Sequence, residues 1–185
     1  MSILLDAGPS LNFLAVSQQC ILIHVAESHD LQIAAPERVD REVEGKTRDP
    51  RFERTAARGT WRSLKSSGRI QILGDTLTTQ EFTDAVSRIS GMPAENRIRR
   101  SESLGEIMVL AHASVYAQQG NQVFVLMDES DGRRRARREQ EWLAKQSGLG
   151  QITLWSTLRV LRAAARHQGW IAGGLTWEVV YRRAL

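Results

Sequence analysis

Short apolar runs, separated by longer stretches with helical spacing, constrain the fold of this chain more than any other feature. The runs lie near 2–5, 31–35, 69–73, 122–127 and 151–154. Strands buried on both faces read as continuous apolar runs, which is typical of a parallel sheet covered by helices. The pattern therefore predicts an α/β fold with a central parallel sheet of about five strands.

The segments between these runs carry the apolar spacing of helices. We expect helices near 9–28, with a break around 17–20, and near 37–46, 50–66, 78–89, 103–118, 132–146, 156–167 and 173–183. Pro36 suits the first turn of the helix at 37–46, where its missing N–H is not needed. Alternation of strands and helices implies right-handed crossovers between the strands.

Length and composition are those of an ordinary globular protein, and 185 residues fit a single domain, 1–185. The start has no cationic region before its apolar run, and no run approaches membrane-spanning length. We therefore expect a cytoplasmic protein with no membrane association. The single cysteine excludes an internal disulfide, and the net charge of +4 allows a polyanionic partner without requiring one.

Two aspartates each follow an apolar run directly. Asp6 comes after residues 3–5, and Asp128 comes after residues 123–127. In an open parallel sheet, ligands bind in the crevice beyond the carboxyl ends of the strands, so both side chains are candidates for a binding site there. Each one alone is also explained as a turn residue or a helix N-cap.

Two glutamates are further candidates. Glu106 opens a helix that is apolar almost all round and hence buried, so its carboxylate needs a partner or a cation to stay ionised. The alternative is a capping box, because Ser103 stands three residues before it. Glu42 lies in the second turn of the helix at 37–46, where it also fits a solvated face of mixed charge.

Basic residues follow Asp128 closely. The acidic segment 128–131 runs into an arginine-rich helix start, and acids beside arginines suit a site that holds both a metal and a phosphate. Arg133 and Arg134 are candidates to bind nucleic acid, as are Arg97 and Arg100 in the loop 91–101. The alternative is a solvated helix face with ion pairs such as Arg135 with Glu139.

Other chemistries lack their motifs. The sequence has no glycine-rich phosphate loop, no G-x-S-x-G elbow and no cluster of cysteine and histidine with metal-ligand spacing.

The order of the acidic residues resembles the PIN-domain family of VapC-type toxin nucleases. The closest branch reads Gly-Glu, an alanine-rich helix, an apolar strand and Asp-Asp-x-x-Gly/Ala-Arg. This chain has Gly105-Glu106, the helix to Ala117, the run 123–127 and then Asp-Glu-Ser-Asp-Gly-Arg at 128–133. The segments 35–43 and 156–161 also resemble the family, so the likeness covers nearly the whole chain.

This resemblance implies a three-layer α/β/α sandwich and a Mg²⁺- or Mn²⁺-dependent endoribonuclease, the toxin of a toxin–antitoxin pair. Asp6, Glu42, Glu106 and Asp128 would form the catalytic centre, and Asp6, Glu106, Asp128 and Glu129 would bind the metal. Carboxylate oxygens are the hard ligands that these cations prefer. RNA as the substrate, an antitoxin partner and a homodimer come from the resemblance alone.

The chain departs from the family at two positions. Gly8 stands where members often carry Ser or Asn, so Ser10 or Asn12 would have to supply that polar group, and Glu129 replaces a more usual Asp. A PIN-like module that binds nucleic acid without cleaving it is therefore the main alternative. Another metal-dependent phosphoryl-transfer enzyme is a third, weakened because Asp6 lacks the second acid of an Asp-x-Asp pair.

Overall fold

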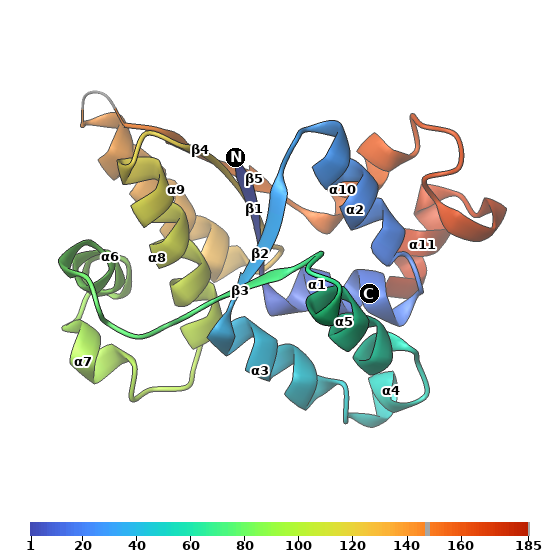
Figure 1. The fold of residues 1–185 in the computed structure, drawn as a ribbon, viewed down its shortest axis with the longest axis horizontal. Coiled ribbons are helices and arrows are strands. Elements are labelled where there is room, and N and C mark those ends of the chain that lie inside the picture. Colours follow the sequence, from blue (N-terminus) through green and yellow to red (C-terminus); the bar gives the residue numbers. More distant parts are fainter. Residues whose placement is uncertain (147–148, 185) are drawn as a thin grey trace.

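The computed structural model describes residues 1–146 and 149–184, and within them the chain forms a five-stranded sheet (Figure 1). All strand pairs are parallel, in the order β3-β2-β1-β4-β5. The strands are β1 (Ser2–Leu5), β2 (Gln32–Pro36), β3 (Gln71–Leu73), β4 (Gln122–Leu126) and β5 (Gln151–Trp155). The predicted α/β class and parallel sheet are confirmed.

Helices cover both faces of this sheet, which gives three layers (Figure 1). In the described residues they are α1 (Ala7–Ala15), α2 (Gln19–Ser28), α3 (Glu37–Lys46), α4 (Pro50–Glu53), α5 (Ala57–Ser66), α6 (Gln80–Ser90), α7 (Ala94–Arg97), α8 (Leu104–Gln118), α9 (Ser130–Ala144), α10 (Thr157–Ala164) and α11 (Trp177–Ala184), with a 3₁₀ turn at Ala172–Gly174. Helices α6, α8 and α9 lie on one side of the sheet, and α2, α10 and α11 lie on the other. None of the helices described is long and apolar enough to span a membrane.

The core covers both faces of the sheet, and on one of them it fills the space between the central strands and α8. In β1, Ile3, Leu4 and Leu5 are at most 1% exposed, as expected for a strand covered on both faces. Helix α8 is apolar almost all round because it packs on the sheet with one side and on α6 with the other. The first turn of α8 is therefore held firmly at the carboxyl edge of the sheet.

Local side-chain chemistry explains where the helices differ from the prediction. The expected break between α1 and α2 is present, with Ser17 at a positive φ of 56°. The single helix expected at 50–66 is wrong, because Thr55 Oγ1 donates to the Phe52 carbonyl and interrupts it between α4 and α5. Pro36 precedes α3 as its N-cap and ends β2, so its expected place in the first helical turn is wrong by one position. The short helix α7 was not predicted.

A buried ion pair joins α6 to α9. Glu139 is 2% exposed and accepts from Arg88 Nη2 at 2.6 Å and from Ser114 Oγ at 2.5 Å. Arg88 also lies over the Trp142 ring, 3.6 Å from its centroid. The expected Arg135–Glu139 pair is therefore wrong, because Glu139 faces the protein interior and not the solvent.

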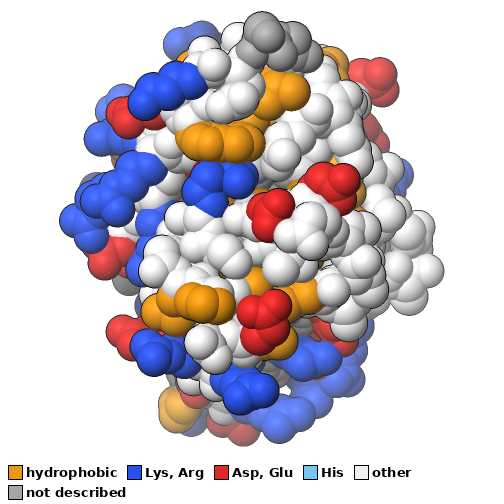
Figure 2. Space-filling view, turned by 90° about the vertical axis from the view of Figure 1, so that its left-hand side faces the viewer, with side chains coloured by type: hydrophobic (Ala, Val, Ile, Leu, Met, Phe, Trp, Pro, Cys, Tyr) orange, Lys and Arg blue, Asp and Glu red, His pale blue; other side chains and the backbone are white. Residues whose placement is uncertain are grey.

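The outer face over α6 to α9 carries charges of both signs. Figure 2 shows Lys and Arg side chains gathered along its left margin and its lower edge, with acidic side chains between them and toward the right. The exposed arginines of α9 include Arg134, Arg137 and Arg138. This face is thus basic along that margin and the lower edge, and of mixed charge elsewhere.

Candidate functional site

Asp6 and Asp128 follow neighbouring strands at the centre of the sheet. β1 and β4 pair with Leu5 opposite Leu126, and the Asp6 N–H donates to the Leu126 carbonyl at 3.1 Å. The chain adds β2 and β3 on one side of β1, and β4 and β5 on the other. A crevice forms outside the carboxyl ends of the strands at such a switch point. The two aspartates therefore start on either side of the position where α/β proteins bind ligands.

Glu42 and Glu106 reach the same region from two helices that pack together, α3 and α8. Glycines make the approach possible. A Cβ atom on Gly105 would lie 2.7 Å from Oε2 of Glu42, and one on Gly132 would lie 3.0 Å from Oε2 of Glu106. Both distances are shorter than ordinary van der Waals contact, so each carboxylate lies directly against the backbone of the neighbouring helix.

The ionisation of Asp6 is affected by two of the other predicted acids. Burial raises the pKa of Asp6 from 3.8 to about 7, opposed by a hydrogen bond from the Ala7 backbone. The negative charges of Glu106 and Glu42 raise this pKa further, whereas Lys46 lowers it. Asp6 is 4% exposed, and no ion pair to it is present among the described residues.

The pKa of Glu106 is raised as well. Burial is the main cause, and the negative charges of Glu129, Asp131 and Glu42 act in the same direction, against the positive charge of Arg135. A carboxylate that interacts with so many others is destabilised in its ionised form. A divalent cation would reverse this effect by favouring the ionised form.

Each of the other acids has a polar partner. Glu42 accepts from Arg38 Nε at 3.0 Å, and Glu106 pairs with Arg135 Nη1 at 3.2 Å. Asp128 accepts from the backbone N–H of Thr157 at 2.8 Å and from its hydroxyl at 2.5 Å. Asp128 is thereby fixed toward the start of α10, on the side of β4 away from β1.

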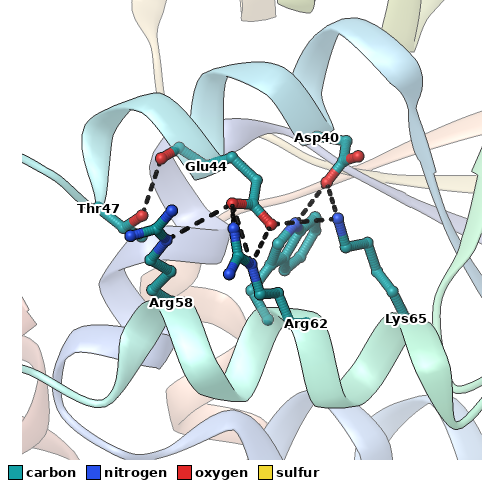
Figure 3. A network of polar contacts seen from close by, with 7 residues as sticks. Asp40, Glu44, Thr47, Arg58, Arg62 and Lys65 are labelled. Atoms are coloured by element: carbon teal, nitrogen blue, oxygen red, sulfur yellow. Dashed lines mark hydrogen bonds and ion pairs between the residues drawn. The ribbon is translucent and has the colours of Figure 1, made fainter.

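A polar network holds α3 in place from its outer side (Figure 3). Lys65 Nζ donates to Asp40 at 2.6 Å, and Arg62 Nη2 donates to Glu44 at 2.9 Å. Glu42 is two residues from both acids, and 3.6 residues per turn place it on the opposite face of the helix. This network between α3 and α5 therefore directs Glu42 toward α8.

A hollow of about 420 Å³ adjoins two of the predicted acids, Asp128 and Glu129. Its lining includes Gly8, Asn12, Lys46, Phe52, Asp128 and Glu129. Lys46 is exposed at the end of α3 and lowers the pKa of Asp6, so it brings positive charge to the acidic edge. Lys46 was not among the predicted site residues, although a spacing of four residues places it on the same helix face as Glu42.

Three polar side chains lie near the acids in the sequence, Ser103, Ser10 and Asn12, and the structure gives them different roles. Ser103 adopts a left-handed conformation with φ of 49° and makes no side-chain cap hydrogen bond, so the capping box is wrong. Ser10 is buried and donates its hydroxyl to the Asp6 carbonyl at 2.7 Å. Asn12 lines the hollow, and it is the one of the two that can supply a polar group there.

The four candidate arginines have different surroundings. Arg133 Nη1 donates to the carbonyls of Met127 and Trp155, which ties the ends of β4 and β5 together. Arg97 is 5% exposed and donates to the carbonyls of Arg100 and Glu102, so its expected role in contacting nucleic acid is wrong. Arg134 and Arg100 are exposed, the former paired with Asp131.

The donor set matches the chemistry of a hard cation, because it consists of carboxylate oxygens at a sheet edge, and burial raises the pKa of two of them, Asp6 and Glu106. In the described residues, however, no three acidic, histidine or cysteine side chains stand close enough to hold a metal ion together. Binding would require Glu42, Glu106 or Asp128 to turn from its present partner toward Asp6.

Comparison with protein-family models, curated proteins and solved structures finds no match for this chain.

Proposed function

We propose that this protein is a metal-dependent nuclease that cleaves RNA by attack of water on the phosphodiester. The observation that carries the proposal is that Asp6 is buried at the β1/β4 switch point, a region that Glu42 and Glu106 reach from α3 and α8. Burial, with the negative charges of these two acids, raises the pKa of Asp6 to about 7. A buried carboxylate such as Asp6, beside two partly buried ones, is not explained by stability, since an ionised group costs free energy there.

Asp6 and Glu106 would hold Mg²⁺ or Mn²⁺, with Asp128 and Glu129 beside them. When bound, such a cation lowers the pKa of a water molecule and neutralises charge on the phosphodiester. Lys46 would contact a phosphate oxygen at the rim, and Arg134 would bind a phosphate further along the strand. Glu42 would orient the attacking water or bind a second cation. Water attack gives a 5′-phosphate and a 3′-hydroxyl.

RNA is the proposed substrate on the grounds of the family resemblance. The attack does not use the ribose 2′-hydroxyl, so the acids themselves do not discriminate against DNA. The antitoxin partner and the homodimer that the resemblance implies remain predictions of the same origin.

The product ends test this function. Purified protein is incubated with an RNA pool and a single-stranded DNA pool, with Mg²⁺, Mn²⁺ or a chelator, and the ends of the products are sequenced. We expect cleavage only with metal, and ends that carry 5′-phosphate and 3′-hydroxyl. Cyclic phosphate ends, or cleavage undiminished by chelator, would contradict the mechanism, and binding without cleavage under every condition would support the non-catalytic module.

A further inference from the structure

A second hollow, of about 500 Å³, lies along α10 on the opposite face of the sheet from α8. We call it the α10 groove. Its lining includes Val25, His29, Trp155, Arg159, Arg162 and Arg166. It thus combines an apolar floor with aromatic rings and guanidinium groups, and none of these residues belongs to the acidic site.

Aromatic rings form one wall of the α10 groove. Trp155 packs against Phe124, with ring centroids 4.7 Å apart, and against His29, with centroids 5.5 Å apart. The Nε1 atom of Trp155 is buried and has no hydrogen-bond partner among the described residues. His29 is exposed, so one face of this aromatic group is accessible to a ligand.

Three arginines line the α10 groove along one face of the helix. Arg159, Arg162 and Arg166 are spaced by three and four residues, which places them in one row. All three are exposed, and no carboxylate in the described residues forms an ion pair with them. Arg159 lies over Trp155, 5.7 Å from its ring centroid. Their charge is therefore available to a polyanion.

One hydrogen bond links the α10 groove to the hollow at the acidic edge. Ser156 lines the groove, and its neighbour Thr157 donates its backbone N–H to Asp128, which lines the hollow at the acidic edge. The arginine row starts next to this junction and extends along α10 away from it. A strand with a phosphodiester at the acids could therefore continue along the row.

From this arrangement we infer that the α10 groove binds the single-stranded RNA substrate beside the cleaved bond, with phosphates on Arg159 and Arg166 and a base stacked on His29. Single-strand binding sites combine a basic groove with aromatic stacking surfaces, and both are present. The choice of RNA as the ligand rests on the proposed function. The binding itself needs neither metal nor the acids.

Binding is tested separately from cleavage, in chelator and in an Asp6→Asn background. Fluorescence anisotropy measures the affinity for a short labelled single-stranded RNA at several salt concentrations. We expect Arg159→Gln/Arg166→Gln to lower the slope of log affinity against log salt by about 1.4, at about 0.7 per lost phosphate contact. His29→Ala should weaken binding roughly fivefold with the slope unchanged, because it removes stacking and not charge.

The matched control is Arg54→Gln/Arg183→Gln, which removes the same charge from exposed positions outside the α10 groove. It should leave the salt slope nearly unchanged. An equal loss in both double variants would show that only the net charge matters and would overturn the proposal. If the groove variants lower the slope but the wild-type protein never cleaves RNA, the α10 groove is a binding site and the nuclease function is wrong. If the wild type cleaves RNA and the groove variants bind normally, the nuclease function is supported and the α10 groove is not the binding site.

Discussion

Asp6→Asn is expected to slow RNA cleavage by roughly a thousandfold or more, because it removes a buried carboxylate on which about 4 kcal/mol of transition-state stabilisation depends. Asparagine has nearly the same shape, and the Asp6 backbone N–H that bonds to Leu126 is retained. The fold should therefore be preserved. Initial cleavage rates in Mg²⁺, together with circular dichroism spectra, measure the two effects.

Asp30→Asn is the matched control for this substitution. Asp30 is exposed, and its φ of 51° is a conformation that asparagine tolerates well. We expect wild-type cleavage from this variant. Full activity in Asp6→Asn would show that Asp6 is not part of the catalytic centre, whatever the behaviour of the control.

The second large effect concerns the pH dependence of stability in the absence of metal. The pKa of Asp6 is raised from 3.8 to about 7 in the folded protein, so folding favours its protonated form. Its contribution to stability is complete below about pH 3.8 and is lost as the pH rises through about 7. The amide introduced by Asp6→Asn does not titrate. As the pH rises from 4 to 8, the free energy of unfolding of wild type should therefore fall by about 2 to 4 kcal/mol relative to that of this variant.

Urea denaturation in chelator at several pH values measures this difference. Glu106 also has a raised pKa and remains in both proteins, so the difference between the two curves reports Asp6 together with its repulsion of Glu106. Parallel stability curves for Asp6→Asn and wild type would show that Asp6 ionises normally, and would contradict its burial beside the other acids.

The sequence predicts the sheet well because its strands are buried on both faces and therefore read as uninterrupted apolar runs. The runs around Leu4 and Val125 lie within one or two residues of the observed strands. Helix ends were harder to predict. The hydroxyl of Thr55 interrupts one helix, and the contacts of Arg97 with carbonyl groups stabilise a short one. Neither interaction follows a periodic pattern in the sequence.

The candidate site was predicted in part. The rule for parallel sheets places Asp6 and Asp128 at one edge because it depends only on strand order, and the apolar character of α8 indicates that Glu106 is partly buried. The approach of Glu42 to Gly105 depends on how α3 packs against α8, which no local pattern encodes. For the same reason Lys46 was overlooked, and the sequence could not show that Asp128 bonds to Thr157.

Binding of Mn²⁺ tests the central claim most directly, because it asks whether the acidic edge holds a divalent cation before any substrate is present. Electron paramagnetic resonance counts free Mn²⁺ during titration of wild type, Asp6→Asn and Asp30→Asn at a pH chosen above the raised pKa of Asp6, which is about 7. We predict saturable binding by wild type and Asp30→Asn, and its loss in Asp6→Asn. Equal binding by all three proteins, or none by wild type, would contradict a metal centre at the carboxyl ends of β1 and β4.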